Sequence, residues 1–385
     1  MDSHNSPRGA GSSASGAASP TYLLYVDHKG AAVTASHVAD GPFGIGVQLN
    51  STGVGELRRQ GAAAEEAGFT FVSVGDNPEH MRDTFVSLAE LAHATAHCSI
   101  GTTITTPHHR DPLVVASAFS SVAELAPGRV FVGIGTGRAR RPARINELRE
   151  HLQALRALWS REEVLHRGEP LRLSWEAAPV PIVVCGSGPR ALETAGEYAD
   201  GVIIETGLSE KLVARAREWV AAGARRSGRR LEDLQLWWYA RTSIGTTAAE
   251  AHAESDVSMA AAGANLARHD PGLTDVPERY RAGLRELGER YDMSAHLRTD
   301  ADNPNRGLVS DELREYLADR IGVVGAPSDW LDRIAQLRNR GVDNILCIGA
   351  SGDKDKLIRL VGEHVIPHLG GPRGPVGFAA DHAAR

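Results

Sequence analysis

Four stretches of this chain place glycine, hydroxyl, acidic and basic side chains directly after short apolar runs. They are GDNPEH at 75–80, TITTPHHR at 103–110, GIGTGR at 133–138 and GSGPR at 186–190. Histidine titrates near neutral pH, so His80, His108 and His109 are candidate proton donors; the alternative for each is a surface or hydrogen-bonded histidine. Neighbouring residues of an extended segment point to opposite faces, so His108 and His109 are not expected to share a metal ion, and no metal site is predicted.

The two glycine-rich stretches suit close contact with a ligand. In the GTG sequence at 135–137, two positions have no side chain, so the backbone can approach a bound group. The GSGP sequence at 186–189 ends an apolar run and opens a helix, and exposed N–H groups at a helix start bind anions. We predict a phosphate at Ser187 and Gly188; the alternative is a tight turn without a ligand. Neither stretch has the residues of a Walker loop or of a Rossmann fingerprint.

Charged and aromatic residues near these stretches are candidates for recognising a substrate. Arg138 begins an arginine cluster after the GTG sequence, which suits a carboxylate or a phosphate; a solvated helix start is the alternative. Asn77 and Glu205 each follow another apolar run, and both are candidate substrate contacts. Of the aromatic residues WWY at 237–239, at least one is expected in the core, and another could stack on a substrate.

Eight short apolar runs alternate with amphipathic helical patterns from residue 43 onward. Runs that are apolar on both faces are typical of parallel strands covered by helices, and their alternation with helices indicates βαβ units. Eight such units predict an α/β fold, a (β/α)8 TIM barrel with insertions; a doubly wound open sheet is the alternative. The predicted strands are 43–49, 70–74, 98–104, 129–134, 182–185, 201–205, 234–244 and 344–348. Because loops after barrel strands meet at one face, the four stretches are expected to share one site.

The predicted barrel does not use the whole chain. Residues 1–20 are rich in Gly, Ser and Ala and predict a flexible tail, and 371–385 predict a C-terminal tail. Residues 21–370 are expected to form a single barrel domain. An insertion at about 250–320 would form a wall of the substrate pocket or a subunit contact.

The composition excludes several classes of function. The 385 residues carry a net charge of −6, with 42% hydrophobic and 23% charged residues, as expected for a globular protein that does not bind nucleic acid. No apolar run approaches the ~20 residues that span a bilayer, and no signal core is visible, so we expect a cytoplasmic protein without membrane partners. The three cysteines, at 98, 185 and 347, are too sparse for a disulfide framework and are expected as buried thiols.

Four segments resemble the luciferase-like flavin and deazaflavin oxidoreductases. They are AAAEEAGFTFVSVGD at 62–76, residues 100–137 from IGTTITTPHHR to GIGTG, VCGSGPRALETAGEYADGVII at 184–204, and VVGAPSDWLDRIAQLRNRGVDNILCI at 323–348. Within this superfamily they are similar to the coenzyme F420-dependent branch, which includes methylenetetrahydromethanopterin reductase. The segments occur in the family's order and cover most of 43–205 and 321–365.

The resemblance implies a cofactor across the C-terminal mouth of a luciferase-like barrel. That cofactor is coenzyme F420, with FMN as the alternative, and hydride passes between its C5 and a small organic substrate. The resemblance also implies a non-prolyl cis peptide between Thr103 and Ile104 against the ring, a phosphate at 186–188, and a homodimer. The implied cofactor contacts are Asp76, Thr103, Ile104, Thr105, Thr106, Gly135, Thr136, Gly137, Gly186, Ser187, Gly188 and Pro189.

The chain departs from its F420-dependent relatives at three positions near the substrate. Where relatives carry His, Glu and Lys, it has Asn77, Arg138 and the run that begins at Glu205. A sugar phosphate is therefore not the expected substrate, and the substrate stays open. Two other functions stay open as well: an FMN-dependent monooxygenase of the luciferase type, and a barrel that binds flavin without turnover.

Overall fold

The computed structural model describes residues 24–26, 32–34, 42–50, 53–137, 142–270, 272–273, 275–295, 298, 302–349 and 353–370. The chain divides into two compact units, Met1–Ala39 and Asp40–Arg385. In the first unit, β1 (Leu24–Val26) pairs antiparallel with β2 (Ala32–Thr34). The expected tails at 1–20 and 371–385 lie outside the described residues.

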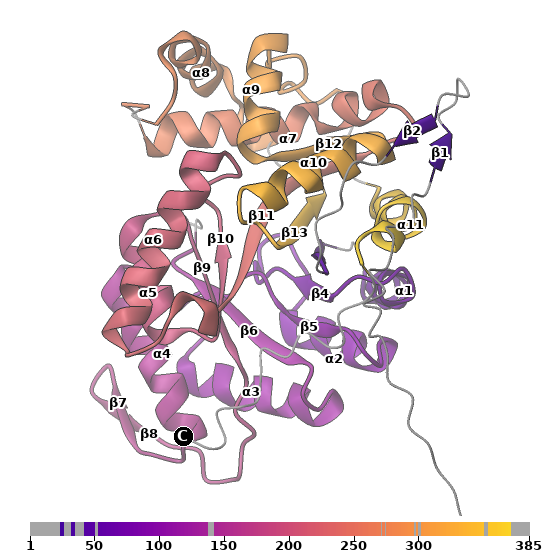
Figure 1. Ribbon diagram of the computed structural model, residues 1–385. Helices are drawn as coiled ribbons and strands as arrows, with labels where there is room; N and C mark the ends of the chain where they lie inside the picture. The colour runs from indigo at the N-terminus through magenta and orange to yellow at the C-terminus, as the bar shows by residue number, and fades with distance from the viewer. Residues whose placement is uncertain are drawn as a thin grey trace, which may run out of the picture. The chain divides into compact units, whose positions relative to one another are not determined.

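The second unit is built on a closed barrel of eight parallel strands, and the predicted fold is confirmed (Figure 1). Around the barrel the strands follow the order β3, β4, β5, β6, β9, β10, β11 and β13, and β13 pairs with β3 to close the ring. Each strand overlaps its predicted range. The strands are β3 (Gly44–Leu49), β4 (Phe71–Val74), β5 (Ser99–Thr102), β6 (Val130–Gly135), β9 (Ile182–Gly186), β10 (Gly201–Ile204), β11 (Gln235–Ile244) and β13 (Asn344–Gly349).

Helices cover the outside of the barrel, and local signals start and end them. The Asp83 carboxylate caps α2 (Thr84–Ala94) by accepting the N–H of Phe85 at 2.9 Å. Pro112 opens α3 (Pro112–Leu125), and Gly68, at φ +89°, follows the end of α1 (Val54–Glu66). The remaining outer helices are α4 (Ile145–Trp159), α5 (Pro189–Tyr198), α6 (Glu210–Arg226), α10 (Pro327–Asn339) and α11 (Lys354–His364).

The lumen of the barrel is filled by side chains rather than open. Trp237 on β11 and Phe71 on β4 meet edge to face, with ring centroids 4.6 Å apart. Tyr239 and Ile104 are half-buried and pack against this cluster, whereas Trp238 belongs to the outer core between strands and helices. We call the cluster the lumen plug; it consists of Phe71, Phe131, Val183, Cys185, Ile203, Trp237 and Leu346. One tryptophan of the WWY sequence is thus core inside the barrel, and Tyr239 lies between it and the mouth.

The insertion forms a helical layer with its own apolar core. It contains α7 (Ala248–His269), α8 (Glu278–Arg290) and α9 (Asp311–Ile321), which lie together beside β11 (Figure 1). A ninth strand, β12 (Gly322–Gly325), pairs with the end of β11 and was not predicted. The hairpin of β7 (Val164–His166) and β8 (Glu169–Leu171) was not predicted either. Short 3-10 turns occur at η1 (Leu231–Asp233), η2 (Met293–Ala295) and η3 (Ile366–His368).

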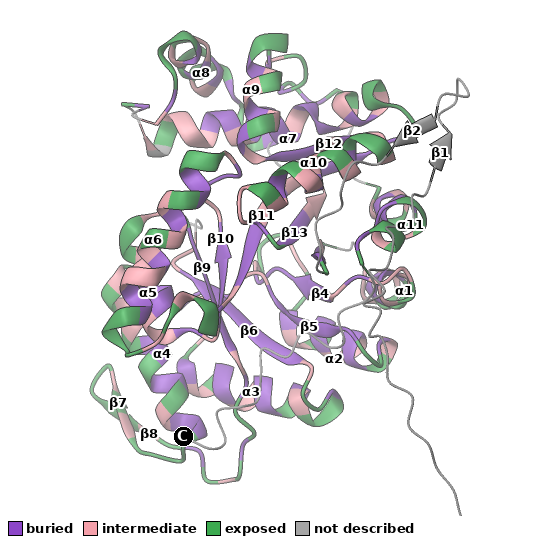
Figure 2. Cartoon of the chain, viewed as in Figure 1, coloured by how far each residue is buried: buried purple, intermediate pink, exposed green. Residues whose placement is uncertain are grey.

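Burial follows this layered arrangement. The barrel strands are buried and the outward faces of the surrounding helices are exposed (Figure 2). All three cysteines are buried and free, as predicted. No helix among the described residues is long and apolar enough to cross a bilayer.

One buried histidine predicts acid sensitivity of the fold. His151 on α4 is fully buried, and neither ring nitrogen has a hydrogen-bond partner among the described residues. Burial, together with His166 and Arg167, lowers the pKa of His151 from 6.5 to about 4, although Asp111 opposes the shift. The folded state therefore keeps this ring neutral, while the unfolded chain binds a proton below pH 6.5.

Stability should consequently fall as the pH drops from about 6.5 towards 4, by about 2–3 kcal/mol from this group. Urea unfolding of wild type and His151→Leu at pH 7 and pH 4.5 measures the effect. The leucine variant should lose less stability between the two pH values than wild type does. Equal losses in the two proteins would show that His151 does not contribute.

Candidate active site

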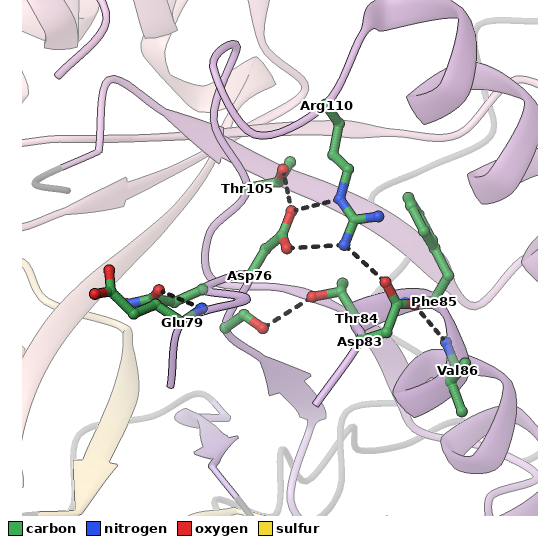
Figure 3. A network of polar contacts seen from close by, with 10 residues as sticks. Asp76, Glu79, Asp83, Thr84, Phe85, Val86, Thr105 and Arg110 are labelled. Carbon is green, nitrogen blue, oxygen red and sulfur yellow. Dashed lines mark hydrogen bonds and ion pairs between the residues drawn. The ribbon is translucent and has the colours of Figure 1, made fainter. Parts of the chain in front are cut away.

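A buried carboxylate organises the mouth of the barrel where β4 and β5 end. Asp76 follows β4, its side chain is 2% exposed, and it accepts a hydrogen bond from the Thr105 hydroxyl at 2.7 Å. Arg110 donates to both Asp76 oxygens, at 3.2 and 3.4 Å, and to Asp83 at 2.9 Å (Figure 3). Burial alone would lower the pKa of Arg110, but its bonds to the two carboxylates raise the pKa overall. The predicted site residues Asp76 and Thr105 are therefore in direct contact.

The segment after β5 is held from several sides. The peptide bond between Thr103 and Ile104 is cis, which confirms the geometry that the resemblance implies. The Gln48 side-chain amide donates to the Thr103 carbonyl, and the Ser73 hydroxyl lies 2.8 Å from the Thr103 hydroxyl. Backbone bonds join Thr105 to β6. Gln48 and Ser73 come from β3 and β4, so the lumen itself fixes the position of this segment.

The two predicted glycine bends lie beside each other. β6 and β9 pair in parallel, with Gly135 opposite Cys185, so the GTG and GSGP sequences leave neighbouring strands. A Cβ at Gly135 would lie 2.8 Å from the carbonyl oxygen of Cys185. Gly137 has φ +72°, and a Cβ there would lie 2.5 Å from Cγ2 of Thr106. Both positions require glycine, and the second brings the bend against segment 103–106.

The N-terminus of α5 is open. The N-cap residue is Gly188, which has no side chain to cap the helix amides, and Pro189 occupies the first turn. Ser187 is exposed, and nothing lies within 4 Å of a Cβ built on Gly188. The amides of this first turn therefore have no side-chain acceptor in the described structure, which leaves them available to an anion.

The three candidate histidines have different surroundings. His80 is exposed in the turn after β4. His108 is half-buried, and its Nε2 lies 3.5 Å from the Glu147 carboxylate on α4. His109 is also half-buried, and its backbone N–H donates to the Thr106 carbonyl at 3.1 Å. All three remain candidate proton donors, and His109 is anchored most directly to segment 103–106.

The structure describes two of the three candidate substrate contacts, and one of these two lies beside a predicted glycine bend. The Asn77 side-chain oxygen accepts the N–H of Glu79 at 3.3 Å. Glu205 is half-buried, and its N–H donates to the Gly186 carbonyl at 2.9 Å, so it stands beside the second glycine bend. Arg138 lies outside the described residues. Within the described ranges, no group of three or more His, Cys, Asp or Glu side chains is placed to hold a metal ion.

Sequence reasoning missed the groups that support the predicted contacts. Arg110, Gln48 and Ser73 are absent from the predicted set, although they hold Asp76 and Thr103. A signal existed for Arg110, because a carboxylate buried at a strand end needs a cationic or hydrogen-bonding partner, and Arg110 lies in the next loop. Gln48 and Ser73 carried a weaker signal, as polar residues within otherwise apolar strands.

Comparison with known proteins places this architecture in a family. The model of the family described as luciferase-like monooxygenase matches residues 41–344. The chain is 28% identical over 319 residues to 5,10-methylenetetrahydromethanopterin reductase of Methanolobus tindarius, covering 79% of this chain and 93% of the relative. It is 26% identical over 357 residues to F420-dependent glucose-6-phosphate dehydrogenase of Nakamurella multipartita, covering 85% and 96%.

A solved structure shares the fold. The coenzyme F420-dependent tetrahydromethanopterin reductase from Methanopyrus kandleri superposes with a TM-score of 0.69 at 21% identity, covering 86% of this chain and all of that one. The barrel, its cis peptide after β5 and the family match over residues 41–344 agree with one another. This chain belongs to the luciferase-like monooxygenase family.

Proposed function

We propose that this protein is a coenzyme F420-dependent oxidoreductase that transfers a hydride between the deazaflavin C5 and a small organic substrate. One observation carries the proposal: segment 103–106, the GTG bend and the open start of α5 follow the adjacent strands β5, β6 and β9. Together they would form a surface against which a planar ring can pack, with an anion site beside the ring. The relative named as an F420-dependent glucose-6-phosphate dehydrogenase matches 85% of this chain and supports this choice of cofactor.

The donor groups at the mouth fit the proposed cofactor. The α5 amides and the Ser187 hydroxyl would hold the phosphate, since they are open and no carboxylate of α5's first turn opposes them. Ile104, half-buried above the lumen plug, would contact the ring. When bound, the deazaflavin supplies the hydride chemistry, and the protein supplies orientation and exclusion of water.

The chain's own residues have three tasks in this proposal. Asp76 fixes the Thr105 hydroxyl and, through Arg110, ties the two loops together. The lumen plug closes the barrel below the site, so water reaches the site only from the mouth. His109 or His108 would move a proton to or from the substrate, since an imidazole ring can both donate and accept a proton.

Turnover under controlled oxygen tests the proposal against the FMN monooxygenase. The protein is mixed with reduced coenzyme F420 and a panel of small carbonyl and alkene compounds, and reoxidation is followed by absorbance at about 420 nm. We expect one or more compounds to reoxidise the deazaflavin at equal rates with and without oxygen. Turnover that requires FMN and consumes oxygen would establish the monooxygenase instead, and binding without any turnover would favour the non-catalytic barrel.

We further propose that the protein acts as a homodimer in the cytoplasm. Apolar side chains on two adjacent outer helices support an interface: Val86 on α2 is 54% exposed and Val114 on α3 is 48% exposed. Light scattering of the purified full chain distinguishes a dimer from a monomer.

A further inference from the structure

Tyr239 lies on the barrel wall that faces the proposed position of the cofactor ring. In the closed barrel, β5 and β11 are separated by the same number of strands in either direction, so they form opposite walls. Ile104, which follows β5, and Tyr239, on β11, both pack against the lumen plug. Side chains alternate along a strand, so Tyr239 points to the same side as Trp237, a member of the plug. A ring that packs against segment 103–106 therefore turns its other face towards Tyr239.

The substrate has to lie between this ring and the wall formed by β11. In the proposed complex, segment 103–106 covers one face of the ring, so the hydride can pass only across the other face. The lumen plug fills the barrel below, so the reacting atoms of the substrate lie above the plug. Tyr239 is half-buried at this level. Its phenol is thus placed beside the atoms that react.

The neighbouring strand supplies an acceptor where Tyr239 supplies a donor. β10 and β11 pair with Ile204 opposite Trp238, so the next pair along the two strands is Glu205 and Tyr239. A carboxylate only accepts hydrogen bonds, whereas a phenol can donate one. Tyr239 can therefore bind an atom that gains negative charge, which Glu205 cannot do as a carboxylate.

Arg241 adds a positive charge beside Tyr239. Its guanidinium lies 5.7 Å from the Tyr239 ring centroid. Its Nη1 donates to the Ser258 hydroxyl on α7 at 3.0 Å, so the helical insertion holds this charge in place. A fixed positive charge favours negative charge that develops near it, and does so most where water is excluded.

We propose that Tyr239 is a catalytic residue whose hydroxyl donates a hydrogen bond to the reacting oxygen or nitrogen of the substrate. When a hydride adds to the carbon of a C=O or C=N bond, the electron pair of that bond moves to the oxygen or nitrogen. The phenol stabilises this charge until the atom receives a proton from one of the histidines proposed above. This inference rests on the proposed function, because it concerns the substrate of the same reaction.

Tyr239→Phe tests this role, because it removes the hydroxyl and keeps the aromatic ring on the plug. Single-turnover reoxidation of reduced coenzyme F420 is measured with the panel compound that wild type turns over fastest, at a saturating concentration. We expect the rate to fall at least about a hundredfold. Two equilibrium titrations give a second readout. The variant should bind oxidised coenzyme F420 as wild type does, and this complex, which has no hydride to give, should bind the compound within about tenfold of wild type.

Tyr198→Phe is the matched control. The Tyr198 hydroxyl accepts the Gln153 amide at 3.4 Å between the outer helices α4 and α5. This variant should keep the wild-type rate and both affinities. Circular dichroism checks that each variant folds, and Tyr239→Leu, which also lacks the hydroxyl, replaces Tyr239→Phe if that variant does not fold.

Three results would overturn this inference alone. The first is a Tyr239→Phe rate within about threefold of wild type. The second is a parallel loss of coenzyme F420 affinity, which would assign Tyr239 to the cofactor. The third is a loss of compound binding with an unchanged saturated rate, which would make Tyr239 a binding contact only. A wild-type protein that turns over no compound would overturn the proposed function, and this inference with it.

Discussion

Replacing Ser187 by aspartate should raise the dissociation constant for coenzyme F420 at least about a hundredfold. The residue sits between the end of β9 and the first turn of α5, where we place the cofactor phosphate. A carboxylate there would face the phosphate charge and would occupy the helix amides in its place. Because the Ser187 side chain is exposed, the substitution should leave the fold unchanged.

The control for this prediction is Ser187→Ala, which removes one hydroxyl donor and adds no charge. It should bind coenzyme F420 within about tenfold of wild type. Fluorescence titration measures both variants, and circular dichroism checks that they fold. An aspartate variant with wild-type affinity would move the phosphate away from the start of α5.

Asp76→Ala should slow turnover by about 10- to 100-fold, because it removes one of the bonds that hold segment 103–106 in place. In wild type the Asp76 carboxylate accepts bonds from Thr105 and Arg110, and both would lose that acceptor. Arg110 keeps its bond to Asp83, so the Arg110 guanidinium still has a carboxylate partner. We expect about 1–3 kcal/mol of lost stability and a folded protein.

A comparison with Asp76→Asn separates charge from hydrogen bonding. The amide oxygen still accepts the Thr105 hydroxyl, so this variant should keep more activity than alanine and lose mainly the attraction to Arg110. Steady-state rates with the substrate found in the oxygen-controlled assay, together with urea unfolding, measure the two effects. Unchanged rates in both variants would remove Asp76 from the site.

The barrel was predictable from the sequence because its signal is local. Buried parallel strands are apolar on both faces, and each run is followed by a helix with a clear start or end, such as Asp83, Pro112 or Gly68. The strand β12 was missed because it has only four residues and follows α9 directly. The β7–β8 hairpin was missed because none of its residues is buried and its strands lack a long apolar run.

The site was predictable only where a motif or a resemblance marked it. The glycine bends and the cis peptide at Thr103–Ile104 lie where they were expected. The pairing of Asp76 with Arg110, however, joins residues 34 positions apart, and sequence spacing does not encode it.

Equilibrium titration of the purified full chain with coenzyme F420, FMN and FAD tests the central claim most directly. We predict saturable binding of one coenzyme F420 per chain, tighter than FMN or FAD, and loss of this binding in Ser187→Asp. Absence of binding by all three cofactors, or a clear preference for FMN, would contradict it.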